Sequence, residues 1–239
     1  MYNILFSLLA GAATFSLLYF THLLRLGEAI VPSVVVLGVT MFMLGRRIFK
    51  QLEPLFEKVG KELQQQRFDA AIAVLKSGYP LGKWQFGVPT QIDSQIGMIL
   101  YLRKDFTAAI PYLARSQRMG HWLGVAMLAV AYYKKKDTAR MYGAFEVLSR
   151  RAKKQGLAWN LYAYCLTQLG KNEEAQKILV RGDEATKDDK RVKDNLLALQ
   201  NGKKMKMRGY AEQWYQFHLD APPALMMDGR SQFSARRRR

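Results

Sequence analysis

The sequence predicts an all-α protein, with an N-terminal transmembrane helical hairpin, then an α-solenoid of repeated helix pairs, and last C-terminal capping helices. Three observations predict this architecture. Two long apolar runs open the chain, helix pairs with a recurring small-residue spacing follow, and a further amphipathic stretch comes after the last pair. We assign residues 1–50 to the hairpin, 51–187 to about four helix pairs, 188–220 to the capping helices and 221–239 to a disordered basic tail.

The first apolar run covers about residues 3–24 and the second about residues 29–45. The first run exceeds the roughly 20 residues that cross a bilayer. A cleaved signal peptide is disfavoured, because no Lys or Arg precedes Arg25 and the run is too long. The second run is uncharged but short, and Arg46 and Arg47 after it can extend it to the interface. A second span is therefore favoured over a re-entrant segment.

A short connection, residues 25–28, makes the two runs a hairpin. Its single Arg is balanced by a Glu, whereas Arg46, Arg47 and Lys50 follow the second run. By the positive-inside bias, both termini and the soluble part face the cytoplasm. We therefore expect an integral membrane protein, in the inner or plasma membrane if the chain is bacterial. The small residues of Ser7-x3-Gly11 and Ala12-x3-Ser16 offer faces to another helix, so a homo-oligomer through the hairpin is one option.

The clearest helix pair runs from Trp159 to Leu179, with a Gly-Lys-Asn turn between its helices. Its pattern of large and small residues is Trp159-x2-Tyr162-Ala163-x2-Leu166, followed by Ala175-x3-Leu179. Two antiparallel helices approach closely only where a side chain is small, so Ala163 and Ala175 should lie on facing surfaces. The stretch resembles the tetratricopeptide-repeat family, whose period is about 34 residues.

Weaker copies precede this pair at nearly the period of the family. The marker positions of their second helices are Ala71, Ala109 and Met141, at intervals of 38, 32 and 34 residues up to Ala175. An insertion with Gly and Pro, residues 79–89, accounts for the long first interval. Glu53-Pro54 predicts the start of a helix directly after the membrane, without a flexible linker.

The region after the last pair contains two apolar stripes. Val192, Leu196 and Leu199 predict a helix that covers the terminal repeat. Tyr210, Trp214 and Phe217 are spaced four and three apart, which predicts a further capping helix on the last repeat. The alternative for these aromatic residues is a place at the lipid headgroups.

The family resemblance implies that the first helices of the repeats line a concave partner-binding groove. Counted from the matched positions, its residues are Ser94, Met98, Tyr101, Leu102, Val130, Tyr133, Lys134, Asn160, Tyr164, Thr167 and Gln168. Aromatic and Met side chains with scattered polar groups suit a peptide or a helix as ligand. The alternative is that some of these residues contact the chain's own C-terminal segment. Family members that clamp a carboxylate use Lys, Asn and Arg here, and only Asn160 matches, so that role is not supported.

The residues indicate no catalytic chemistry, so we do not expect an enzyme. The three histidines are far apart in sequence, and none pairs with the single Cys165 at a metal-ligand spacing. Residues 78–84 resemble a phosphate-binding loop, but the loop is one residue short and lacks the Ser or Thr that holds magnesium. We assign no catalytic residue, no cofactor and no metal.

The sequence thus favours a membrane-anchored, cytoplasm-facing scaffold that binds a protein or peptide partner and recruits it to the membrane or a membrane complex. The net charge is +18, and residues 1–45 contribute nothing to it. This excess also suits an anionic lipid surface, through Arg46, Arg47, Lys203, Lys204, Lys206, Arg236, Arg237, Arg238 and Arg239. One alternative is a membrane-tethered nucleic-acid or ribosome contact, although the lack of a recognition module disfavours nucleic acid. Another is an accessory subunit that contacts a membrane client through its hairpin.

Overall fold

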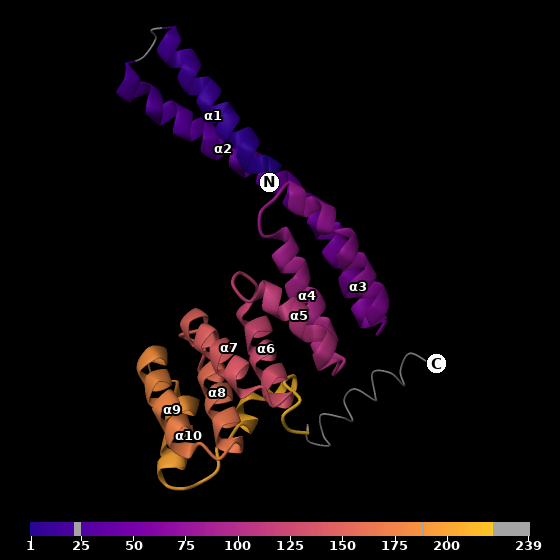
Figure 1. The fold of residues 1–239 in the computed structure, drawn as a ribbon, viewed down its shortest axis with the longest axis vertical. Coiled ribbons are helices and arrows are strands. Elements are labelled where there is room, and N and C mark those ends of the chain that lie inside the picture. Colours follow the sequence, from indigo (N-terminus) through magenta and orange to yellow (C-terminus); the bar gives the residue numbers. More distant parts are fainter. Residues whose placement is uncertain (22–24, 188, 222–239) are drawn as a thin grey trace. The chain divides into compact units, whose positions relative to one another are not determined.

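The computed structural model describes residues 1–21, 25–187 and 189–221 of the chain. In this part every regular element is a helix (Figure 1), so the prediction of an all-α chain is confirmed at that level. The helices form two compact units, residues 1–99 with 118–120, and residues 100–117 with the chain from His121 onward. The predicted basic tail lies outside the described residues, except for Ala221.

The first unit opens with a hairpin of α1 (Tyr2–Phe20) and α2 (Leu26–Gln64). α2 continues through both Pro32 and Pro54. The helix start predicted at Pro54 is therefore wrong, and the apolar and amphipathic parts belong to one helix of 39 residues. A proline removes one backbone hydrogen bond, and contacts of α2 with α1 and α3 on either side of this point hold the helix together.

The two hairpin helices contact each other through small and polar residues. The buried residues of α1 and of the first two turns of α2 are Asn3, Ser7, Gly11, Ala29 and Ser33. Both serine hydroxyls are satisfied within their own helix, since Ser7 donates to Asn3 O at 2.7 Å and Ser33 to Ala29 O at 2.6 Å. A Cβ atom at Gly11 would lie 3.1 Å from Leu37 Cβ. The predicted small face of Ser7 and Gly11 is thus occupied within the hairpin, whereas that of Ala12 and Ser16 is exposed.

The first unit continues with α3 (Phe68–Ser77), the 3-10 helix η1 (Tyr79–Lys83) and the start of α4 (Val88–Leu102). α3 packs against the second half of α2, and Leu52, Leu75 and Ile92 are buried there. Gly78 ends α3 at a close approach, where an added Cβ would meet Leu55 at 2.9 Å and Ile92 at 3.1 Å. The insertion predicted at residues 79–89 consists of η1, the irregular residues 84–87 and the first two residues of α4.

The second unit is a series of helices in which each contacts the next. They are α5 (Phe106–Ser116), α6 (Trp122–Lys134), α7 (Thr138–Arg151), α8 (Gly156–Gln168), α9 (Asn172–Thr186) and α10 (Lys190–Gln200). Ala163 and Ala175 are fully buried, as the predicted close approach requires. The rings of Phe145 on α7 and Tyr162 on α8 stack at 4.5 Å.

Every second helix from α2 to α10 ends in the same turn. Each of these turns contains one residue with a positive φ. In chain order these residues are Gln66, Lys104, Lys136, Gly170 and Gly202, at intervals of 38, 32, 34 and 32 residues. In each turn the next amide donates to the carbonyl five residues back, over 2.8 to 3.0 Å. This is the Schellman motif, which satisfies carbonyls at a helix C-terminus. The first three intervals equal those between the marker residues of the sequence copies, and α10, predicted as a capping helix, ends in the same turn.

After α10 the chain does not form the predicted second capping helix. It runs without regular structure to η2 (Arg208–Tyr210) and then forms the single-turn α11 (Glu212–Tyr215). Positive φ values of 48° at Ala211 and 53° at His218 interrupt the helix on both sides. The helix predicted from the spacing of Tyr210, Trp214 and Phe217 is therefore wrong.

Candidate functional site

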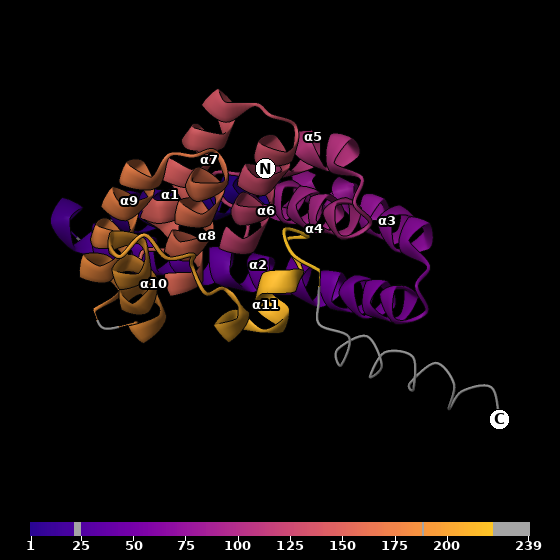
Figure 2. The same ribbon diagram turned by 90° about the horizontal axis from the view of Figure 1, so that it is seen from below.

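One surface of the second unit is covered by the chain's own residues 203–221, which we call the C-terminal segment. Figure 2 shows α11 of this segment, in yellow, beside α6 and α8. The segment is hydrogen-bonded to the side chains of Tyr101, Lys134, Asn160 and Tyr164. All four belong to the groove predicted from the sequence. We call the surface formed by these four residues the inner face.

Two buried asparagines join the C-terminal segment to α8 and α10. Asn160 Nδ2 donates to Gly156 O at 3.0 Å and to the Tyr210 hydroxyl at 2.7 Å. Its Oδ1 accepts from Asn195 Nδ2 at 2.7 Å, and Asn195 Oδ1 accepts from Lys206 N at 2.6 Å. Both asparagines are almost completely shielded from water. An unpaired polar group there would cost about 1–3 kcal/mol, so the network fixes the path of the segment.

Trp214 is the aromatic anchor of the C-terminal segment. Its side chain is fully buried, and its ring meets the Tyr164 ring edge-on at 4.7 Å. The indole Nε1 donates to Asp220 Oδ2 at 2.7 Å, and the Tyr164 hydroxyl donates to Asp220 Oδ1 at 3.0 Å. The ring supplies apolar burial and its N–H finds a partner, as a buried tryptophan requires. The Asp220 carboxylate thereby ties the anchor to α8.

The last part of the segment is held through its backbone. The Tyr101 hydroxyl donates to Phe217 O at 2.8 Å, and Lys134 Nζ donates to His218 O at 2.6 Å. Burial raises the pKa of Tyr101 and lowers the pKa of Lys134. Two side-chain donors thus bind consecutive carbonyl groups. Contacts of this kind recognise a peptide backbone and do not depend on the side chains it carries.

His218 is the titratable group of this contact. Its ring lies 5.9 Å from that of Tyr101, in a stacked arrangement, and packs against Phe106. Desolvation lowers the pKa of His218, and the positive charges of Lys104 and Lys134 lower it further, whereas a hydrogen bond with the Leu102 backbone raises it. Among the described residues, none reaches its buried Nε2. The neutral ring is therefore the form that fits this site.

The other residues predicted for the groove have different environments. Val130 is buried in the core of the second unit, whereas Leu102 and Gln168 are exposed. Tyr133 and Thr167 are half-buried, and the Thr167 hydroxyl donates to Tyr164 O at 2.8 Å. The remaining two, Ser94 and Met98, belong to the first unit. The structure therefore brings four of the predicted side chains onto one bound segment, and the binding of a partner stays a prediction.

Sequence reasoning missed Asn195 and Asp220, and it placed Trp214 on a longer helix than the single turn of α11. The aromatic spacing did signal buried residues, since Tyr210, Trp214 and Phe217 all have exposed fractions of 3% or less. The sequence carries no sign of the long-range bond from Asn195 to Asn160, because both are common residues on polar helix positions.

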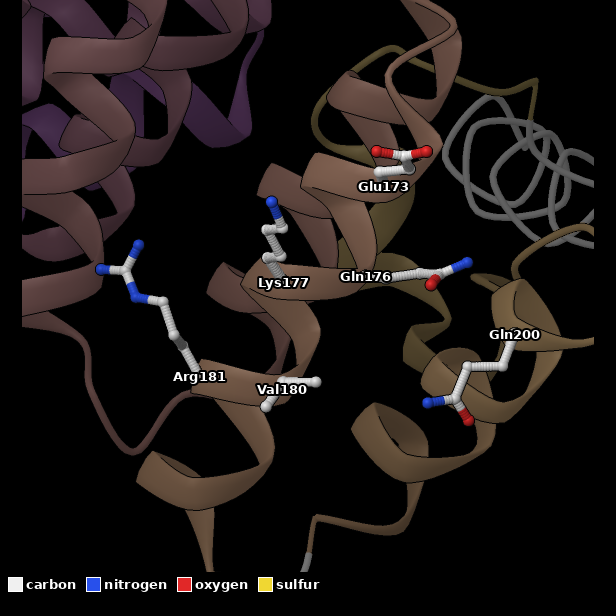
Figure 3. A pocket seen from close by; sticks show the side chains of 6 residues that line it. All are labelled: Glu173, Gln176, Lys177, Val180, Arg181 and Gln200. Atoms are coloured by element: carbon white, nitrogen blue, oxygen red, sulfur yellow. The ribbon is translucent and has the colours of Figure 1, made fainter.

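A shallow hollow of about 500 Å³ lies on α9 and the end of α10 (Figure 3). Its lining residues are Glu173, Gln176, Lys177, Val180, Arg181 and Gln200. Lys177 and Arg181 point away from Gln200, and Arg181 is paired with Glu146 at 3.1 Å. The polar groups diverge, so the hollow has no point at which a small ligand would be held by several of them.

Reactive groups are shielded or scattered. Cys165 is a buried free thiol, and burial raises its pKa well above the usual range, which suppresses its nucleophilic thiolate form. Within the ranges that the structure describes, no three His, Cys, Asp or Glu side chains gather as a metal site needs. Of the predicted anionic-surface residues, Arg46, Arg47, Lys203, Lys204 and Lys206 are exposed. Arg236, Arg237, Arg238 and Arg239 lie outside the described residues.

Comparison with known proteins does not assign the chain to a family. No protein-family model, no curated protein and no solved structure matches the chain significantly. The resemblance to tetratricopeptide repeats therefore rests on the residue pattern and on the turns that recur with it.

Proposed function

We propose that the chain is a membrane-anchored helical-repeat scaffold whose inner face binds a short segment of a protein partner. The C-terminal segment takes this place in the free protein. The observation that carries the proposal is the manner in which this segment is held, by donors from Tyr101 and Lys134 to consecutive carbonyls and by one buried aromatic anchor, Trp214. A surface that binds its own chain through the backbone has the chemistry to bind another peptide.

The membrane part of the proposal is supported by the hairpin. Its two helices are long and apolar enough to cross a membrane, and only 17% and 11% of their most apolar stretches are buried. A soluble protein would shield so much large apolar surface from water. This exposure supports a hairpin whose helices both cross the bilayer, and the basic residues after the second crossing, such as Arg46 and Arg47, favour a cytoplasmic place for the soluble units.

The repeat part of the proposal is supported by the five Schellman turns, whose intervals of 32 to 38 residues bracket the tetratricopeptide period of about 34. In such a solenoid the first helices of the pairs share one side. α6 and α8, which carry Lys134, Asn160 and Tyr164, are first helices in this register. The chain acts by recruitment, and we assign it no catalytic step.

Photo-crosslinking in cells tests this function. A photoreactive residue at Gln168, which is exposed on α8, probes the edge of the inner face, and the same residue at Gln65, exposed after α2, is the control. Trp214→Ala should release the C-terminal segment and increase crosslinks from position 168 to another protein, but leave those from position 65 unchanged. If release changes neither set of crosslinks, the inner face does not receive a partner.

A further inference from the structure

The loop between α3 and α4 is bonded to the very start of the chain. Asn3 N donates to Trp84 O at 3.1 Å, and Asn3 Nδ2 donates to Gln85 Oε1 at 2.9 Å. The Trp84 ring meets the ring of Tyr2 edge-on at 5.1 Å and stacks with that of Phe6 at 6.4 Å. The first of these bonds satisfies the backbone N–H of Asn3, which lies in the first turn of α1 and therefore has no acceptor within its own helix. The loop is therefore fixed to one end of the hairpin.

That end is the boundary of the apolar part of both helices. α1 begins at Tyr2 and has 19 residues, which span about 28 Å at about 1.5 Å per residue. The part of α2 from Leu26 to Gly45 spans about 30 Å, close to the thickness of a bilayer's hydrocarbon core. Gly45 lies beside the loop as well, since an added Cβ would be 3.7 Å from Gln85 Oε1. Residues 84–86 thus share one level with the start of α1 and the end of the apolar part of α2.

The side chains at this level are of the kinds that lipid headgroups favour. Trp84 and Phe86 are 43% and 50% exposed, and Tyr2 is exposed as well. Three exposed cations adjoin residues of this level in the sequence, because Lys83 precedes Trp84 and Arg46 and Arg47 follow Gly45. Tryptophan and tyrosine gather at membrane interfaces because one end of each ring is apolar and the other is polar. Cations at the same depth meet the negative charge of lipid phosphates.

We infer that residues 79–87, together with Tyr2 and the cations Arg46 and Arg47, form an interfacial lipid-binding site. Trp84 and Phe86 insert among the headgroups of the leaflet from which the hairpin emerges, and the cations contact lipid phosphates. The inference rests on the proposed membrane anchoring and extends it, because it adds a loop of the soluble part as a second contact with the bilayer. A lipid is the occupant that fits, because the exposed rings continue the outward apolar surface of the hairpin at its boundary.

Depth-dependent fluorescence quenching tests the site in the full-length protein. The protein is reconstituted into vesicles of phosphatidylcholine and phosphatidylglycerol that carry a nitroxide either on the headgroup or deep in the acyl chain. A small environment-sensitive fluorophore is attached at Lys83→Cys in the loop, at Val35→Cys midway along the apolar part of α2, or at Gln65→Cys. Cys165 is fully buried and is not labelled in the folded protein. Gln65 lies about 30 Å along α2 from Gly45 and is the control that remains in water.

We expect the label at position 83 to lose emission mainly to the headgroup nitroxide, the label at position 35 mainly to the deep nitroxide, and the label at position 65 to neither. Replacing both Trp84 and Phe86 by Ala should weaken the quenching at position 83 and leave that at position 35 unchanged. Deep quenching at position 35 without any quenching at position 83 would overturn the lipid site while the membrane anchor stands. Unchanged quenching at position 83 in the double variant would overturn the role of the two rings. Absence of deep quenching at position 35 would overturn the anchor and the lipid site together.

Discussion

The hairpin of α1 and α2 and the inner face with its bound segment are both rich in apolar residues, but they place large and small side chains in opposite ways. Between the hairpin helices the buried residues are small or polar, such as Ser7 and Gly11, and bulky ones such as Phe42 are exposed. At the inner face the bulkiest ring, Trp214, is fully buried and its one polar atom is bonded. Single large apolar groups are exposed on any protein surface, but a continuous run of them along two helices is typical of a surface that faces another apolar phase. The contrast fits the proposed surroundings, lipid around the hairpin and water around the second unit, and the changes below test it.

The largest effect should come from the anchor of the C-terminal segment. Trp214→Ala removes a fully buried ring, and such changes cost about 3–5 kcal/mol. Hydrogen exchange of the amides in residues 206–220 should therefore approach that of an undocked chain. Leu197→Ala, at an exposed position of α10, should change stability by less than about 0.5 kcal/mol. Equal effects of the two changes would mean that Trp214 does not hold the segment.

A charge on the outward face of the hairpin separates lipid from water. Val35 is 57% exposed, so in water Val35→Arg should change stability by at most about 0.5 kcal/mol. At the centre of a membrane span the same change costs about 2.5–3.5 kcal/mol. We expect less of the Val35→Arg protein in the membrane fraction, whereas the matched change Gln65→Arg leaves the fraction unaltered. An unaltered fraction for both variants would show that the outward face of α2 is not in lipid.

The asparagine network should have an intermediate effect. Asn160→Ala removes the partner of the Tyr210 hydroxyl and the shortest bond of the Asn195 side-chain amide, at a cost of about 1–3 kcal/mol. Urea unfolding of the detergent-solubilised protein measures this cost, and Thr167→Ala on the same helix serves as control.

A double variant tests whether the two residues act together. Tyr210→Phe should add little to the loss of stability caused by Asn160→Ala, since the bond between the two side chains is already lost. Fully additive losses would show that the two residues do not act together.

The smallest effect should be a pH dependence of the docked segment. The pKa of His218 is lowered in the folded protein from its ordinary value of 6.5, so the released segment binds a proton more readily than the docked one. Docking is therefore complete above about pH 6.5 and weakens as the pH falls from there toward the lowered value. Hydrogen exchange of residues 206–220, corrected for intrinsic rates, should rise between about pH 7.5 and about pH 5.5. His218→Gln should remove this dependence and His121→Gln should retain it, and a dependence that survives His218→Gln would contradict its origin.

The repeated helix pairs were predictable because they depend on local residue size. Ala163 and Ala175 marked a close approach of two helices, and both are fully buried. The course of the chain at Pro54 was not predictable from the same local rules. A proline commonly marks a helix start, but packing of α2 against its neighbours outweighs one lost hydrogen bond. The Schellman turns at the ends of the helices were not predictable from the sequence either. Glycine is the usual residue at the position of positive φ, but three of the five turns have Gln66, Lys104 and Lys136 there.

The residues of the inner face were predictable from the sequence, but the course of the C-terminal segment that covers it was not. The register placed Tyr101, Lys134, Asn160 and Tyr164 on one surface from sequence alone. The course of residues 203–221 depends on bonds to residues up to 116 positions away, such as Phe217 O to Tyr101. Helical spacing within the segment gave no sign of these partners, and it favoured a helix that the positive φ of Ala211 prevents.

Binding in trans tests most directly whether the inner face is a peptide-binding surface. The chain is truncated after Lys203, and fluorescence anisotropy measures its binding to a labelled peptide of residues 204–221. We predict saturable binding by the truncated chain, no binding by the full-length chain, and loss of binding when the peptide carries Trp214→Ala. A truncated chain that keeps its helical content but ignores the peptide, or a full-length chain that binds it equally well, would contradict a peptide-binding inner face.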